Sequence, residues 1–162
     1  MMVSKKVILL GKYGSGKTSL IRQFVHQKFS ESYRTTIGVS IEKKILEHNG
    51  LPVSLLIWDI AGETTQQKVA DSYKRGAHGI IYVYDLTRPS TYESLPDELT
   101  QLAALLPGVP VLPVGNKSDL VAEGPLLTMQ HELPLTDGLL TSARTGKNVI
   151  RLFEEITSRM LR

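Results

Sequence analysis

Close to its start, the chain contains the octapeptide Gly11-Lys12-Tyr13-Gly14-Ser15-Gly16-Lys17-Thr18. It fits the pattern G-x-x-x-x-G-K-[S/T], a glycine-rich loop whose backbone N–H groups surround nucleotide phosphates. The loop follows an apolar run at 7–10, typical of a buried strand, and precedes residues 19–25, whose apolar side chains fall at helical spacing. This order suits phosphate binding, because the helix N-terminus adds its positive end and Lys17 adds a full charge. The alternative, a glycine-rich turn without a ligand, is disfavoured by this context.

The composition is that of an ordinary globular protein. Its 162 residues predict a single domain, 1–162. The formal net charge of +3 is spread along the chain without a Lys/Arg run, so we expect no nucleic-acid partner. The absence of cysteine excludes disulfides and lipid attachment through Cys, and no lipid anchor is visible. With no signal peptide and no apolar run that approaches a membrane span, we expect a cytoplasmic monomer.

Apolar strand-like runs alternate with stretches of helical periodicity along the whole chain. Asn49-Gly50 lies between two strand-like runs and predicts a hairpin, so one strand is antiparallel. Pro125 and Pro134 bracket about two helical turns at 126–133. We therefore predict an α/β fold, with a six-stranded, mostly parallel sheet and helices on both faces. The expected strands cover 7–10, 39–45, 53–58, 79–84, 109–114 and 139–143.

Polar motifs follow the expected strands, where ligands bind in sheets of this kind. Asp59 ends a strand and can hold Mg2+ against the phosphates, while Gly62 lets the backbone approach them. The run 116–119, Asn-Lys-Ser-Asp, ends in a carboxylate that accepts hydrogen bonds from two adjacent donors of guanine. Adenine lacks this donor pair, and a polar site left unpaired rejects it. The motif therefore favours GTP over ATP and disfavours an ATP-dependent kinase.

Together these motifs resemble those of the Ras superfamily of small GTPases, and the match runs from Lys5 to about Leu161. The resemblance implies the small G domain of the P-loop NTPases and a molecular switch that hydrolyses GTP to GDP and phosphate with Mg2+. Without a partner, turnover is expected to be slow, about once per hour or slower. The Thr-Ile-Gly-Val run at 36–39 and Trp58-Asp59 favour the Rab-like branch.

The resemblance also assigns roles to individual residues and segments. Effectors are expected to bind switch I (30–40) and switch II (60–75), and GTPase-activating and exchange factors are further expected partners. The implied GTP contacts are Tyr13, Gly14, Ser15, Gly16, Lys17, Thr18, Ser19, Phe29, Thr36, Gly62, Asn116, Lys117, Asp119, Ser142, Ala143 and Arg144. The implied Mg2+ ligands are Thr18, Thr36 and Asp59, and the implied catalytic residues are Lys17, Thr36, Gly62 and Glu63.

Several positions depart from the family pattern. Glu63 replaces the glutamine that orients the attacking water, so either hydrolysis is slow or another group positions the water. Tyr13 is bulky where many relatives carry a small residue, and it either obstructs a partner's arginine, shields the γ-phosphate or points to solvent. Arg34 is a further candidate catalytic residue, an arginine that the chain itself would supply to the γ-phosphate. These departures leave open an alternative: a nucleotide-binding interaction module with negligible GTP hydrolysis.

Overall fold

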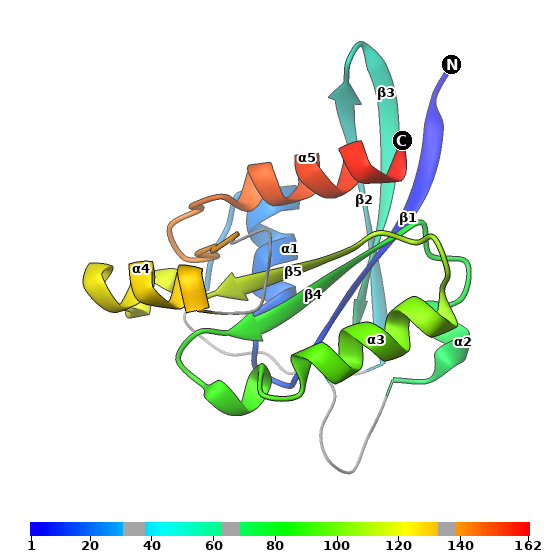
Figure 1. Ribbon diagram of the computed structural model, residues 1–162. Coiled ribbons are helices and arrows are strands. Elements are labelled where there is room, and N and C mark those ends of the chain that lie inside the picture. The colour runs from blue at the N-terminus through cyan, green and yellow to red at the C-terminus, as the bar shows by residue number, and fades with distance from the viewer. Residues whose placement is uncertain (31–37, 63–68, 133–138) are drawn as a thin grey trace.

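A mixed five-stranded sheet forms the centre of the protein (Figure 1). The computed structural model describes residues 1–30, 38–62, 69–132 and 139–162. The strand order is β2-β3-β1-β4-β5, and only the pair of β2 with β3 is antiparallel. The strands are β1 Val3–Gly11, β2 Val39–His48, β3 Leu51–Ile60, β4 Gly79–Asp85 and β5 Val111–Asn116. The predicted fold class is thereby confirmed.

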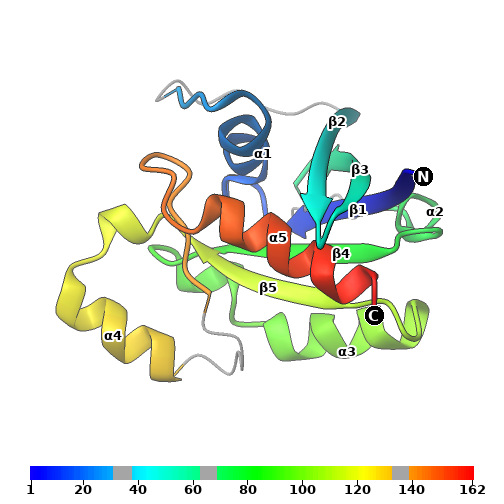
Figure 2. The same ribbon diagram turned by 90° about the horizontal axis from the view of Figure 1, so that it is seen from above.

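Helices cover both faces of the sheet, as Figure 2 shows. Helices α1 and α5 lie on one face, and α3 lies on the other. Helix α4 lies at the end of the sheet, beyond the carboxyl end of β5. Short 3-10 turns, η1 and η2, follow β4 and β5 and lead the chain away from the strand ends. The helices and turns are α1 Lys17–His26, α2 Asp71–Lys74, η1 Pro89–Thr91, α3 Leu95–Leu105, η2 Ser118–Leu120, α4 Glu123–Glu132 and α5 Val149–Met160.

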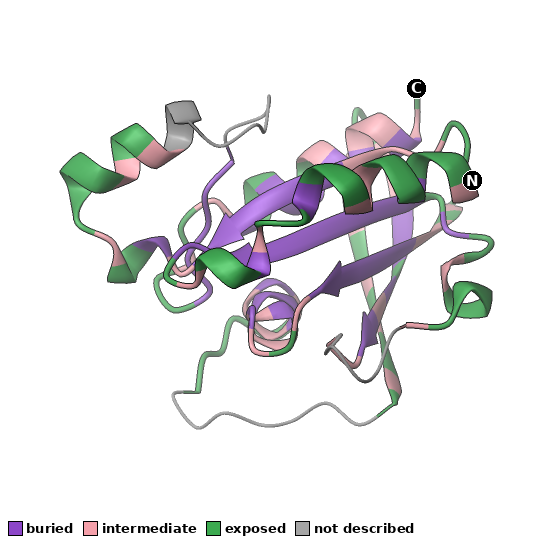
Figure 3. Ribbon diagram, turned by 60° about the horizontal axis from the view of Figure 1, so that its bottom comes forward, coloured by how far each residue is buried: buried purple, intermediate pink, exposed green. Residues whose placement is uncertain are grey.

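Two apolar clusters hold the layers together. One packs α1 and α5 on the sheet, and there Phe24 and Phe153 stack with ring centroids 4.0 Å apart. The other lies under α3 and contains Leu95 and Leu102, which are buried on the face of α3 that meets the sheet. Strand β4 is buried along its whole length (Figure 3), which explains its nearly continuous apolar sequence.

The predicted hairpin is confirmed. Asn49 and Gly50 have φ values of 50° and 79°, and they join β2 to β3. Positive φ at both central residues is the requirement of a two-residue type I′ turn, which explains the Asn-Gly pair.

The sixth strand expected at 139–143 is wrong. Only an isolated parallel bridge joins Leu140 to Gly115. The reason is local, since the Thr141 hydroxyl and the Ala143 N–H both donate to the Asn116 side chain. The chain therefore leaves the sheet after one bridge.

Helix α4 begins earlier than predicted, at Glu123 instead of residue 126. Pro125 is its third residue and does not interrupt it, because N–H groups in the first turn have no helical partner in any case. Leu126 N–H, the next in line, already bonds to the Ala122 carbonyl at 2.9 Å.

Candidate nucleotide-binding site

The phosphate loop lies between the end of β1 and the start of α1. Gly14 and Gly16 have φ values of 76° and 102°, a conformation that favours glycine. Gly16 also needs to be glycine for reasons of space, since a Cβ there would lie 2.2 Å from the Asn116 Nδ2 atom. The same amide donates to the Ser15 carbonyl at 3.1 Å. The phosphate loop is therefore in direct contact with the run 116–119, which is predicted to select guanine and is called the base motif below.

Lys17 and Thr18 open α1 and face the carboxyl end of the sheet. The Lys17 side chain is buried, with its Nζ 3.2 Å from the Gly11 carbonyl oxygen. The Thr18 hydroxyl donates to Asp59 Oδ2 at 2.6 Å, and Asp59 is only 4% exposed at the end of β3. A hydroxyl and a carboxylate held together are oxygen donors of the kind Mg2+ prefers. Thr18 and Asp59, the two predicted Mg2+ ligands that lie among the described residues, therefore fit the ion.

Gly62 lies directly against the phosphate loop. A Cβ at this position would lie 2.6 Å from Tyr13 Cα and 3.0 Å from Lys17 Nζ, so no other residue fits without a shift. The start of switch II is thus within reach of whatever the lysine binds. The predicted roles of Arg34, Thr36 and Glu63 fall on positions outside the described residues.

The base motif begins at Asn116, the last residue of β5, and hydrogen bonds from residues 141–143 hold it in place. The Asn116 side chain is 1% exposed, and its Oδ1 accepts from the Thr141 hydroxyl and the Ala143 N–H at 3.1 and 3.2 Å. The Ser142 hydroxyl donates to Asp119 Oδ1 at 2.8 Å, which orients the carboxylate. Asn116 and Ser142 thus act as supports, and Asp119 is exposed to the solvent side.

A cleft of about 430 Å³ joins the phosphate loop to the base motif. Of the predicted GTP contacts, Ser15 and Ser142 lie behind its wall and are at most 1% exposed. The predicted residues that line it are Tyr13, Gly14, Gly16, Lys17, Thr18, Ser19, Phe29, Gly62, Asn116, Lys117, Asp119, Ala143 and Arg144.

The cleft is also more basic than the motifs predict. Arg22 and Lys28 line it together with Lys17, Lys117 and Arg144, and Asp119 is the one carboxylate among its described lining residues. Cations that surround a cleft concentrate anionic ligands there. Neither residue belongs to a motif, although Arg22 lies one helical turn after Thr18.

Sequence reasoning also missed Asp85, the last residue of β4, and Arg88, three residues after it. The Asp85 carboxyl is fully buried, with its Oδ2 2.8 Å from Lys117 Nζ. Burial alone would raise its pKa, but the hydrogen bonds from Lys117 and Thr87 prevail and hold the pKa of Asp85 below its ordinary value. The carboxylate is therefore charged at neutral pH and stabilises the lysine of the base motif.

Three features meet at one edge of the sheet: the phosphate loop, the strand-end carboxylate and the base motif. Together they define a nucleotide-binding protein of the P-loop class. Comparison with known proteins shows which family: the sequence model of the Ras family matches residues 6–162. The chain belongs to the Ras family of small GTPases, which are GTP-binding switches.

Three similar proteins carry the name Rab. Over 154 residues the chain is 43% identical to Ras-related protein Rab-1A of Dictyostelium discoideum, covering 91% of this chain and 76% of that protein. It is 36% identical to human Ras-related protein Rab-4A over 96% of this chain and 74% of the relative. It is 32% identical to mouse Ras-related protein Rab-7b, over 98% of this chain and 83% of that protein. The Rab-like branch favoured by the sequence is confirmed.

Within the described ranges, no helix combines the length and the apolar character that a membrane span requires.

Proposed function

We propose that this protein is a Mg2+-dependent GTP switch that hydrolyses GTP to GDP and phosphate, slowly unless a partner assists. The observation that carries the proposal is the single cleft in which Lys17, Thr18 and Asp119 are brought together. A cation and a metal-binding hydroxyl at one end suit a polyphosphate, and a carboxylate at the other suits guanine.

In the proposed reaction, water attacks the γ-phosphorus and the bond to the β–γ bridging oxygen breaks, with the water proton passing to phosphate. Lys17 would stabilise the developing negative charge on the β- and γ-oxygens, because its ammonium is buried at the start of α1 and lines the cleft. Gly62 N–H would donate to the γ-phosphate. Thr18 and Asp59, with Thr36 from switch I, would hold Mg2+, which neutralises charge on the phosphates.

Slow hydrolysis is the expected consequence of Glu63. A carboxylate offers no amide N–H to the attacking water, and it carries the same sign of charge as the triphosphate. Loss of the γ-phosphate would then release Thr36 and Gly62 and change how both switches bind partners.

One observation supports the alternative, a nucleotide-binding module with negligible hydrolysis. Tyr13 is 42% exposed and lines the cleft, and its backbone contacts Gly62. We infer that a ring in this position would obstruct a partner's arginine on its way to the γ-phosphate.

Effector binding is proposed through the two switches. On the adjoining face of β2 and β3, Ile41 and Ile45 are 52% and 51% exposed, and exposed Leu56 lies between them, paired with Lys43. Exposed apolar side chains grouped on one face are typical of a surface that binds other proteins.

The proposal is tested first by competition against fluorescent GDP. GTP should displace it and ATP at equal concentration should not, whereas Asp119→Ala should lose this preference. Equal displacement of GDP from wild type by ATP would refute the guanine assignment.

Single-turnover hydrolysis of bound GTP then compares wild type with Glu63→Gln. Slow wild-type turnover that the glutamine accelerates supports the switch with a weak catalytic residue. No turnover in either protein, with GTP retained, supports the interaction module. Fast turnover in both would show that another group positions the water, and Arg34→Ala would then be compared.

A further inference from the structure

Arg88 lies against the outer side of the phosphate loop. Its Nη2 donates to the Tyr13 carbonyl at 2.7 Å, and its Nη1 lies 2.8 Å from where a Cβ on Gly14 would be. Arg88 is not among the described residues that line the nucleotide cleft. The guanidinium therefore binds the loop at the peptide between Tyr13 and Gly14, two residues that line the cleft, while Arg88 itself lies outside it.

The backbone that carries Arg88 is itself fixed. Thr91 is 1% exposed, and its hydroxyl accepts from the Asp85 N–H at 2.9 Å and lies 2.7 Å from the Arg88 carbonyl. The Arg88 N–H bonds to the Asp85 carbonyl at 3.0 Å. The turn after β4 thus presents the arginine in a set position, so little freedom is lost when it binds the loop.

Asp85 connects this arginine to the base motif. Its Oδ2 lies 2.8 Å from Lys117 Nζ and 3.9 Å from Arg88 Nε, while its Oδ1 accepts from the N–H and the hydroxyl of Thr87 at 2.8 and 2.6 Å. A chain of polar contacts therefore runs from the Tyr13 carbonyl through Arg88 and Asp85 to Lys117. Its first contact, between Arg88 and the Tyr13 carbonyl, joins residues that are 75 positions apart in the sequence.

We propose that Arg88 and Asp85 form a clamp that holds the phosphate loop and the base motif in one arrangement and so slows nucleotide release. Both are positioning residues, since they act through Tyr13 and Lys117. The inference rests on the proposed binding of guanine nucleotides. Without the clamp, the phosphate loop and the base motif remain joined by the Asn116–Ser15 hydrogen bond but lose a second connection, so a bound nucleotide leaves more easily.

Dissociation of fluorescent GDP from the loaded protein, chased with excess GDP, measures this effect. We expect Arg88→Ala to release GDP about tenfold faster than wild type, the effect of one lost charge-assisted hydrogen bond. Arg88→Lys keeps a cation that reaches the Tyr13 carbonyl without the planar fork, and should lie between the two. Arg151→Ala, on the exposed side of α5, is the matched control and should leave the rate unchanged.

The double variant of Arg88→Ala with Asp85→Asn tests the connection. If the two residues act as one clamp, the second substitution adds little to the first, whereas independent effects on the release rate would multiply. Multiplying effects would overturn the clamp. The unfolding temperature of each nucleotide-free variant is measured alongside, because a merely structural role would lower it in step with faster release.

The outcomes separate the two proposals. Wild type that fails to bind GDP would refute the proposed function. Wild type that binds GDP, with Arg88→Ala releasing it as slowly as Arg151→Ala, would overturn only the clamp. If Arg88→Ala does not fold, a release rate for Arg88→Lys equal to that of wild type overturns it instead.

Discussion

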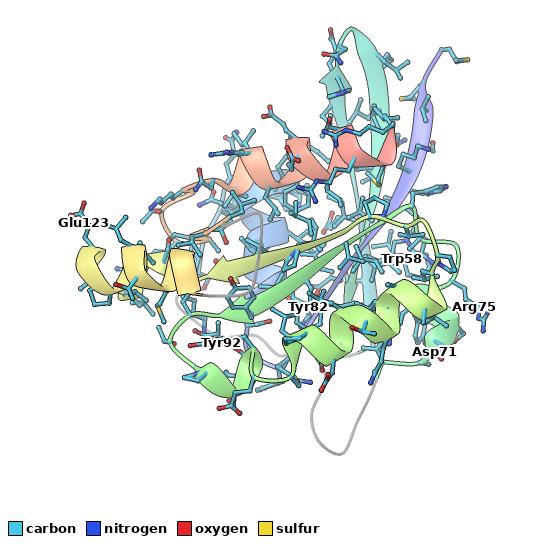
Figure 4. The ribbon with its side chains drawn as sticks, in the orientation of Figure 1. Trp58, Asp71, Arg75, Tyr82, Tyr92 and Glu123 are labelled. Atoms are coloured by element: carbon cyan, nitrogen blue, oxygen red, sulfur yellow. The ribbon has the colours of Figure 1, made fainter. Side chains whose placement is uncertain are left out.

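Glu98→Ala should destabilise the protein although the residue lies on the outer helix layer. Glu98 on α3 accepts from Lys12 Nζ at 2.5 Å and from the Tyr82 hydroxyl, and Tyr82 extends from β4 toward α3 (Figure 4). The side chains of Lys12 and Glu98 are only 19% and 16% exposed. Breaking a fully buried ion pair costs about 3–5 kcal/mol, and an exposed one contributes about 0–1 kcal/mol. We expect a loss of about 2–3 kcal/mol, because this pair is mostly but not fully buried.

Urea unfolding of the GDP-loaded protein at one fixed GDP concentration measures this loss, since ligand binding itself adds to apparent stability. The control is Glu155→Ala on α5, whose partner Arg159 is 2.9 Å away and whose side chain is 39% exposed. That substitution should cost about 0.5 kcal/mol or less. Replacing both buried partners, Lys12→Met with Glu98→Leu, should recover part of the stability, because the buried Tyr82 hydroxyl still loses Glu98 as its acceptor. A Glu98→Ala loss no greater than that of Glu155→Ala would refute the reasoning.

Three further predictions concern other parts of the molecule. Burial and two neighbouring lysines lower the pKa of His78, whose Nδ1 accepts from the Lys6 N–H. The folded protein therefore favours the neutral imidazole, and the contribution of His78 to stability is present above about pH 6.5 and is lost as pH falls below that. Because His78 is exposed, about 0.5 kcal/mol or less should be lost between pH 7 and 5, and urea unfolding of His78→Gln should show a flatter pH dependence. Phe153→Ala should cost about 3–5 kcal/mol of unfolding free energy by urea titration, since the ring is fully buried against Phe24, and a loss below about 1 kcal/mol would contradict this packing. Arg22→Ala should slow GDP association measured by stopped flow, more at low than at high salt, and equal slowing at both would argue against an electrostatic role.

Much of the fold was predictable because its signals are local. The apolar runs identify the strands, Asn49-Gly50 identifies the hairpin, and the spacing of Leu152, Phe153 and Ile156 identifies the last helix, whose apolar face is fully buried. The two errors, at 139–143 and at the start of α4, have different causes. In the first, the Asn116 side chain accepts a hydrogen bond from the Ala143 N–H, which a longer strand would have donated within the sheet. In the second, a proline usually read as a helix boundary occupies a position in the first turn where it is tolerated.

The site was predictable in part, for a related reason. Motif residues follow strand ends, and parallel strands bring those ends to one edge, so the placement of Asp59 and Asp119 beside the phosphate loop follows from the sequence. The contacts of Lys12 and Arg88 do not follow from it. They join residues 86 and 75 positions apart, and nothing near either residue specifies its partner.

These two contacts together bear on how the phosphate loop is held. Lys12 and Tyr13 are consecutive loop residues, and one binds Glu98 on α3 while the carbonyl of the other binds Arg88 before η1. Both partners lie in the segment between β4 and the end of α3, on the same face of the sheet. Since polar contacts on both residues resist rotation of the peptide between them, the loop's conformation is fixed from the α3 side as well as by its glycines. Displacing α3 would therefore remove the Lys12–Glu98 contact and loosen the phosphate loop from a distance, while the Arg88 contact, which is made by the Tyr13 carbonyl, would remain.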